Sequence, residues 1–280
     1  MKQHLLFFFL ISILIPPSLK AQHLDSTFFA EGLNLYQQGQ YLDAVHKWKA
    51  ILANGNDTSL FYGSSFNNIA VAYATMDSLE TAEIWFNKIF DSKLNDRDEG
   101  VDFMQPFANY RHNAAMVCAK MFVRHDMPAK ALPYIWLADT LYSYKTFSGT
   151  GFEKRAVSIA MWKDELYTRL SQPDQALFVL LHKIMDREIG YRLPEMSSIS
   201  YQDFYAPFRE KLINRIQEKY TTKAFKKKLD KALKTARMFT RKKQDYIEFE
   251  LYGKHYVIGT SVSKKEFKKR IVETMFYSLL

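Results

Sequence analysis

Over residues 25–190, apolar residues recur every three or four positions, in blocks that short polar turns interrupt. This period is that of an α-helix with one buried face. Because the turns are short, successive helices are expected to reverse direction and to pack as antiparallel hairpins. The pattern therefore predicts a mainly helical body built from helix–turn–helix units.

Two of these predicted hairpins share a spacing of small and aromatic residues. In the first, Gly32 precedes a turn at Gly39, and in the second, Ala70 precedes a turn at Asp77. In both, an alanine follows the turn and an aromatic residue comes four positions later, on the same helical face. These pairs are Ala44 with Trp48 and Ala82 with Phe86. The small residues let two helices approach closely, and the aromatic ring fills space against the next hairpin.

This spacing resembles the tetratricopeptide repeat (TPR), a helix–turn–helix unit of about 34 residues. Weaker copies follow, so that the equivalent alanines are Ala44, Ala82, Ala131 and Ala176. Their spacings of 38, 49 and 45 residues exceed the ideal repeat and indicate longer helices or loops. The resemblance covers roughly residues 25–190, within a predicted repeat domain at residues 22–192. It implies a TPR-like α-solenoid; an irregular helical bundle with the same spacing is the alternative.

The resemblance also implies a concave surface that holds a peptide or a partner protein. Eight residues are assigned to this surface from the geometry of the repeat. They are Tyr36, Gln37, Asn67, Val71, Met116, Lys120, Glu165 and Arg169. The competing interpretation is that each of them is an ordinary solvated residue.

A second pattern follows a predicted linker at residues 193–206 and forms a basic module over residues 207–280. Apolar residues first recur every four positions, which predicts one helix from Pro207 and a second capped by Thr221. The period then changes from four to two.

This change of period predicts a β-hairpin over residues 247–262, with its turn at Gly253–Lys254. A terminal helix is expected after Ser263, with Phe267, Ile271, Met275 and Leu279 on one face. The expected fold class is thus mainly α: a helical-repeat solenoid followed by a small α+β module of helices, a β-hairpin and a terminal helix.

The first 21 residues have the pattern of a secretory signal peptide. Lys2 precedes an apolar run over residues 5–15, and cleavage after Ala21 would leave Gln22 at the new N-terminus. A membrane-spanning helix needs about 20 apolar residues, which is roughly twice this run. We therefore expect an exported protein of the periplasm or cell envelope, similar to exported proteins of the Bacteroidetes. An uncleaved anchor or a buried helix is the alternative.

Positive charge is concentrated near the C-terminus. Residues 195–280 carry a formal balance of +10, whereas residues 22–194 carry −3. Six lysines of the second module helix are the predicted anion-binding residues: Lys223, Lys226, Lys227, Lys228, Lys231 and Lys234. The expected partners are anionic lipid, lipopolysaccharide or an acidic protein. Export disfavours nucleic acid, and a merely solvated helix face is the competing interpretation.

The sequence offers no motif for catalysis or metal binding. Its single cysteine, Cys118, excludes an intramolecular disulfide, and no histidine pair has the spacing of helical metal ligands. We therefore predict no catalytic residue, no metal and no cofactor. The leading interpretation is an exported TPR-type scaffold or adaptor that mediates protein–protein interaction. The alternatives are a nucleic-acid-binding or regulatory protein with a short N-terminal anchor and, more remotely, an enzyme with its site in the C-terminal module.

Overall fold

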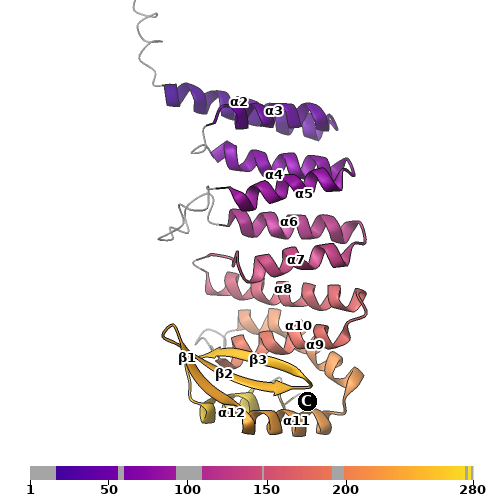
Figure 1. The fold of residues 1–280 in the computed structure, drawn as a ribbon, viewed down its shortest axis with the longest axis vertical. Coiled ribbons are helices and arrows are strands. Elements are labelled where there is room, and N and C mark those ends of the chain that lie inside the picture. Colours follow the sequence, from indigo (N-terminus) through magenta and orange to yellow (C-terminus); the bar gives the residue numbers. More distant parts are fainter. Residues whose placement is uncertain are drawn as a thin grey trace, which may run out of the picture. The chain divides into compact units, whose positions relative to one another are not determined.

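The computed structural model describes residues 17–55, 60–92, 109–146, 148–190 and 199–274, with residues 277, 278 and 280 (Figure 1). The apolar run of the predicted signal peptide lies outside these residues. The chain is mainly helical, with a three-stranded antiparallel sheet near the C-terminus, which confirms the predicted fold class at that level. No helix within the described residues is long and apolar enough to cross a membrane.

The chain divides into two compact units. The first comprises Met1–Met127 and Trp136–Lys145, and the second comprises Pro128–Ile135 and Thr146–Leu280. The division thus lies near residues 127–146 rather than at the predicted linker, residues 193–206.

The first unit consists of helices, and those up to residue 124 each pack against their neighbour along the chain. They are α2 (Pro17–Gln37), α3 (Tyr41–Ala53), α4 (Leu60–Thr75), α5 (Leu79–Asp91) and α6 (Tyr110–Arg124), and the last residues of α7 (Pro128–Asp139) join them. Trp48, Ile51 and Ile69 are among the buried residues of the cluster at the first hairpins. Neighbouring helices therefore close over apolar faces, as the helical period predicts.

The second unit combines helices with the sheet. Its elements after α7 are α8 (Gly149–Arg169), α9 (Pro173–Ile184), the π-helix η2 (Met185–Gly190), α10 (Ile199–Lys219), α11 (Thr222–Thr235), β1 (Arg237–Arg241), β2 (Gln244–Leu251), β3 (Lys254–Thr260) and α12 (Lys264–Glu273). The helix expected from Pro207 begins eight residues earlier, at Ile199, and contains Pro207 in its interior. Of the predicted terminal helix, Phe267 and Ile271 are buried in α12, while Met275 and Leu279 lie outside the described residues.

Four connections between helices repeat one backbone geometry. The left-handed residue of each turn is Gly39, Asp77, Asp126 or Ser171, with φ of 79°, 58°, 54° and 57°. The N–H of the following residue donates to the carbonyl five positions earlier at 2.8 to 2.9 Å in all four turns. The N–H of the left-handed residue itself donates to the carbonyl three positions earlier. This is the Schellman arrangement, which satisfies the last carbonyls of a helix and reverses the chain.

The residues that follow these turns are also equivalent in burial. The alanine five positions after each left-handed residue is fully buried: Ala44, Ala82, Ala131 and Ala176. Four positions later, a larger apolar residue is buried at 0 to 1% exposure: Trp48, Phe86, Ile135 and Leu180. The predicted hairpin turns and the buried alanines are therefore confirmed.

The sheet has the order β1-β2-β3, with both pairs antiparallel. Its two turns, Lys242–Lys243 and Tyr252–Gly253, each have positive φ at both central residues, which is the type I′ geometry. The predicted hairpin is thus confirmed as β2 and β3, but its turn lies one residue before the predicted Gly253–Lys254. Leu251 pairs with Lys254 across this turn.

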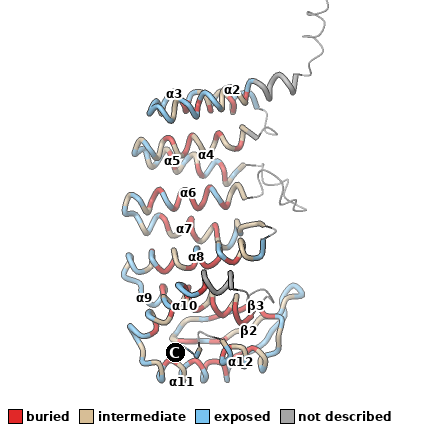
Figure 2. The backbone as a smooth tube through the Cα atoms, turned by 180° about the vertical axis from the view of Figure 1, so that it is seen from behind, coloured by how far each residue is buried: buried red, intermediate tan, exposed pale blue. Residues whose placement is uncertain are grey.

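One hydrophobic core runs through the second unit. It joins residues of α8, α9, α10, α11, β2, β3 and α12, such as Val157, Leu180, Phe208, Phe225, Ile247, Ile258 and Phe267. Figure 2 shows buried residues on these strands as well as on the helices. The helical hairpin α8–α9 therefore does not have a core separate from that of the C-terminal module.

Close backbone contact joins the π-helix to the sheet. A β carbon at Gly190 would lie 2.2 Å from the carbonyl oxygen of Gly259, so only glycine fits there without movement. The N–H of Ser261 also approaches the Gly190 carbonyl at 3.5 Å. η2 thereby brings α9 directly onto β3.

Candidate functional site

Four of the predicted groove residues lie on α2 and α4 of the first unit. Tyr36, Asn67 and Val71 are half-buried, and Gln37 is exposed. The Tyr36 hydroxyl lies 2.8 Å from Oγ1 of Thr75, at the end of α4. Tyr36 therefore links two hairpins and is only partly available to a partner.

The other four predicted groove residues lie on α6 and α8. Met116 is buried at 6% exposure, so it belongs to the helix packing and not to the surface. Lys120 is exposed on α6, as are Glu165 and Arg169 on α8. Within the first unit, the surface candidates are thus Gln37 and Lys120, with Asn67 and Val71 partly exposed.

A groove of about 340 Å³ lies in the second unit, along α8 and beside α10. Val157, Met161 and Trp162 line it with apolar surface. Charged and polar side chains complete its lining: Lys154, Ser158, Glu165 and Lys211. An apolar floor with a few polar groups at the margin is typical of a site that takes a peptide side chain. Of the eight predicted residues, the structure places Glu165 in this groove.

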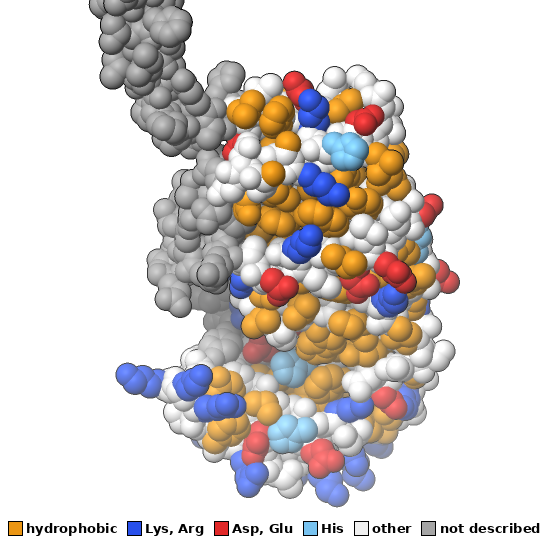
Figure 3. All heavy atoms as spheres, turned by 45° about the horizontal axis from the view of Figure 1, so that its top comes forward, with side chains coloured by type: hydrophobic (Ala, Val, Ile, Leu, Met, Phe, Trp, Pro, Cys, Tyr) orange, Lys and Arg blue, Asp and Glu red, His pale blue; other side chains and the backbone are white. Residues whose placement is uncertain are grey.

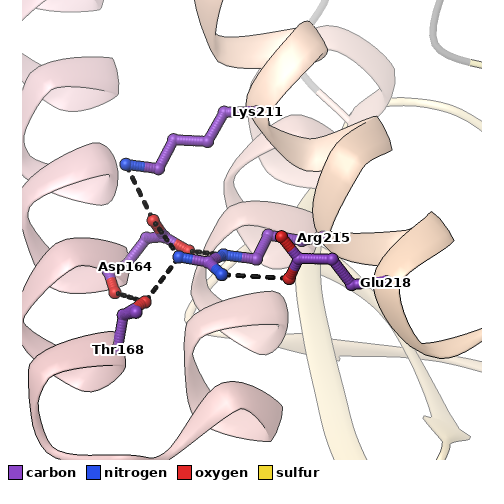
Figure 4. A network of polar contacts seen from close by, with 5 residues as sticks. All are labelled: Asp164, Thr168, Lys211, Arg215 and Glu218. Atoms are coloured by element: carbon purple, nitrogen blue, oxygen red, sulfur yellow. Dashed lines mark hydrogen bonds and ion pairs between the residues drawn. The ribbon is translucent and has the colours of Figure 1, made fainter.

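A buried carboxylate holds α10 beside the groove (Figure 4). Asp164 on α8 is fully buried. It lies 2.8 Å from Nζ of Lys211 and accepts a hydrogen bond of 2.9 Å from Nε of Arg215. Arg215 also donates to Thr168 at 2.6 Å and to Glu218 at 3.0 Å. The hydrogen bond from Arg215 to Asp164 is the main cause that raises the pKa of Arg215.

A second group of buried polar side chains fixes the beginning of α10. Glu153 on α8 is fully buried and accepts hydrogen bonds from Arg187 of η2, at 2.9 Å and 3.1 Å for Nε, and from the hydroxyl of Tyr205 at 3.0 Å. Arg209 of α10 pairs with Glu188 at 2.9 Å. The pKa of Tyr205 is raised mainly by burial and secondly by the negative charge of Glu153. Its hydroxyl therefore remains a neutral donor. These carboxylates therefore position helices.

Sequence reasoning did not single out Asp164, although the repeat spacing marks it. Asp164 precedes Ala176 by the same interval as Gly32 precedes Ala44 and Ala70 precedes Ala82. The sequence signal for Asp164 is that a carboxylate occupies a repeat position that carries a small residue, Gly32 or Ala70, in the first two hairpins. It indicates that the α8–α9 hairpin has a different neighbour from the others.

The six predicted anion-binding lysines lie on α11. Its apolar residues Phe225, Leu229, Ala232 and Leu233 are buried, and Lys226 is half-buried. The remaining lysines are exposed: Lys223, Lys227, Lys228, Lys231 and Lys234. Lys and Arg side chains also gather over the surface of the sheet and its neighbouring helices (Figure 3).

Two of these lysines border a second hollow, of about 320 Å³. Lys228 and Lys231 line it together with Thr235, Glu250 and Tyr252. The Glu250 carboxylate lowers the attraction of this hollow for an anion. The exposed cations of the module therefore form a broad basic surface and not one closed anion pocket.

The described residues contain no group of His, Cys, Asp and Glu side chains able to hold a metal ion. Cys118 is fully buried in α6. Nδ1 of the buried His112 lies 3.1 Å from the carbonyl of Ala138 and 2.8 Å from that of Tyr142. Its burial in the case of Cys118, and these contacts in the case of His112, give each residue a place in the packing of the first unit.

The groove beside α8 and the basic surface of the module are thus the two candidate binding sites. Compared with known proteins, the chain matches no protein-family model and no curated protein sequence.

Proposed function

We propose that this chain is an exported, TPR-like scaffold or adaptor of the cell envelope. It holds a protein partner on the first helices of its hairpins and contacts an anionic partner through its basic C-terminal module. The observation that supports this proposal best is the fourfold recurrence of one turn geometry with a buried alanine five residues later. Helix hairpins that recur in this way stack side by side and leave extended surfaces for partners.

The groove beside α8 is the most specific candidate for the protein partner. Val157, Met161 and Trp162 offer apolar surface, while Glu165 and Lys154 offer charges of opposite sign at its margin. Apolar burial supplies affinity and the margin supplies orientation. The ion pairs of Asp164 fix α10 beside this groove, so the site exists before a partner arrives.

The experiment that tests this function is site-specific cross-linking in the cell. A photoreactive amino acid at Glu165 is expected to give an adduct with one defined partner protein, and Met161→Arg is expected to remove that adduct. Leu42 on α3 and Ile84 on α5, at 56% and 55% exposure, provide matched surface positions on second helices of hairpins. The same adduct from Leu42 or Ile84 would contradict a groove-specific partner.

The compartment is tested by the N-terminus of the natural protein. Export predicts a mature chain that begins at or near Gln22 and is found outside the cytoplasm. A chain that keeps residues 1–21 and stays in the cytoplasm would contradict the export proposal and favour the nucleic-acid-binding alternative.

A further inference from the structure

Within the described residues, β1 is an open edge of the three-stranded sheet. Its residues, Arg237–Arg241, pair with β2 on one side, and all five are exposed. The other edge strand, β3, packs against α9 and η2. There, the Val257 carbonyl lies 3.1 Å from Nε2 of His182. As far as the described residues show, β1 is therefore the edge that is accessible to a further strand (Figure 1).

Part of the β1 backbone faces away from β2. The type I′ turn at Lys242–Lys243 makes Arg241 and Gln244 a hydrogen-bonded pair. Bonded and non-bonded pairs alternate along an antiparallel ladder, so the N–H and C=O groups of Met238 and Thr240 point outward. Such outward groups are those with which an added strand pairs.

The side chains of β1 alternate between the two faces of the sheet. Met238 lies opposite the buried Ile247, whereas Arg237, Phe239 and Arg241 lie on the other face. The Phe239 ring stacks on Tyr246 at 5.3 Å between centroids. One face of the edge strand thus presents an aromatic ring between two guanidinium groups.

The charge around this edge is mainly positive. Arg237 pairs with Glu248 at 2.7 Å while 81% of its side chain stays exposed. Within the described part of the chain, Arg241, Lys242 and Lys243 form no ion pair. Arg241 and the turn lysines therefore keep their attraction for an incoming carboxylate.

A second copy of the chain is a poor occupant for this edge. Two β1 strands that paired antiparallel about Phe239 would bring Arg237 of one copy opposite Arg241 of the other. Like charges directly opposite one another destabilise a strand pair, and basic edge residues are a common protection against self-association. The same charges favour a strand that carries carboxylates.

We propose that β1 binds an extended acidic polypeptide segment, which joins the sheet as a fourth strand. Its backbone pairs with the outward groups of Met238 and Thr240, and its carboxylates lie against Arg237, Arg241 and the Lys242–Lys243 turn. The inference rests on the part of the proposed function that gives the basic module an anionic partner. It identifies this partner as a protein and assigns the contact to β1 in addition to α11.

The probe for this proposal is a short synthetic peptide that alternates glutamate with valine. Its binding to the full chain is measured by fluorescence anisotropy over a salt series. The control peptide has the same sequence with methyl groups on alternate backbone nitrogens, so it keeps the charge but loses strand pairing. We expect the control to bind at least about tenfold more weakly, and the binding of both to weaken as salt rises.

Matched variants locate the contact. Arg237→Glu with Arg241→Glu is expected to weaken binding by at least about tenfold. Lys265→Glu with Lys269→Glu on α12 changes the net charge equally and is expected to alter binding by no more than about twofold. Thr240→Pro removes one outward N–H, leaves the β2 ladder intact and is expected to reduce binding to that of the methylated peptide. Thermal unfolding checks that each variant folds.

Three outcomes would overturn the proposal. Equal binding of the two peptides would show charge attraction without strand addition. Equal losses in the two double variants would place the contact away from β1. Binding to vesicles of anionic lipid with none to the peptide would identify a lipid partner, and would leave the proposed anionic contact of the module intact. The cross-linking result at Glu165 is independent of all three.

Discussion

Gly32 of α2 lies directly against the indole ring of Trp48 on α3. A β carbon at Gly32 would be 2.5 Å from Nε1 of Trp48, closer than side-chain contacts allow. Because Trp48 is 1% exposed, the ring has no free space into which to move. The two helices of the first hairpin are thus at the separation that a glycine permits.

Gly32→Ala is expected to destabilise the protein by about 1–3 kcal/mol, since the added methyl group forces the hairpin apart. Urea denaturation measures the change in the free energy of unfolding. Glu31→Ala is the matched control, because Glu31 is exposed and its ion pair with Lys47 lies at the surface. Equal stability of Gly32→Ala and the parent would contradict the close packing of α2 on α3.

Because the four turns are equivalent, replacing serine by glycine in one turn and glycine by serine in another should change the stability of the protein in opposite directions. Gly39 and Ser171 occupy the same left-handed position, which costs an ordinary L-residue about 1–2 kcal/mol. We expect Ser171→Gly to stabilise the protein and Gly39→Ser to destabilise it, each by roughly 0.5–1 kcal/mol after the backbone entropy of glycine is included. Thermal unfolding of the two single variants gives the signs. Changes of the same sign would show that the two turns are not equivalent.

Asp164→Ala is expected to loosen α10. The change leaves Arg215 and Lys211 without their buried carboxylate, and breaking a buried pair on one side costs about 3 kcal/mol or more. Hydrogen exchange should then increase along α10. Glu218→Ala, which removes an exposed partner of the same arginine, should cost less than about 1 kcal/mol. Comparable costs for the two variants would mean that the burial of Asp164 does not matter.

Lys264 is expected to stabilise the protein by capping the C-terminal end of α11. Its ammonium group donates to the carbonyls of Lys234 at 3.0 Å and of Ala236. A cation there satisfies terminal carbonyls and interacts favourably with the helix dipole. Lys264→Met should therefore cost about 1 kcal/mol, whereas Lys265→Met, at the exposed neighbouring position, should cost almost nothing. Chemical denaturation of this pair of variants tests the difference.

Alkaline pH is expected to destabilise the second unit through Tyr205. Burial raises the pKa of its phenol above the ordinary value of 10.0. The neutral phenol therefore contributes its full stability below about pH 10, and this contribution is lost as the pH rises further, because only the unfolded chain ionises readily. The free energy of unfolding should fall above about pH 10, and Tyr205→Phe should reduce the slope. An unchanged slope would show that Tyr205 ionises normally in the folded protein.

The helical hairpins are predictable from sequence because their determinants are local. A left-handed residue at Gly39 or Asp77 and a small residue five positions later set the turn and the close helix approach. The strands β2 and β3 are predictable for a similar reason, since the buried residues Ile247, Phe249 and Leu251 alternate with Glu248 and Glu250 on the other face.

Other elements depend on contacts that residues outside their own segment supply. β1 is exposed along its whole length, so Arg237–Arg241 has no hydrophobic alternation and becomes a strand only by pairing with β2. η2 keeps a helical spacing of apolar residues, and nothing local distinguishes it from an α-helix. The groove at Glu165 requires Lys211, which comes from a helix 46 positions further along the chain.

The shared core of the second unit has a consequence for how this chain can change in length. The module covers the apolar side of α8 and α9 that a further hairpin would need for its own attachment. In the proposed stack, growth by duplication of a hairpin is therefore blocked after α9 and remains open only upstream of α8. In that proposed stack the module is the terminal element, and we expect a chain cut at residue 192 to expose this apolar side to solvent and to lose solubility.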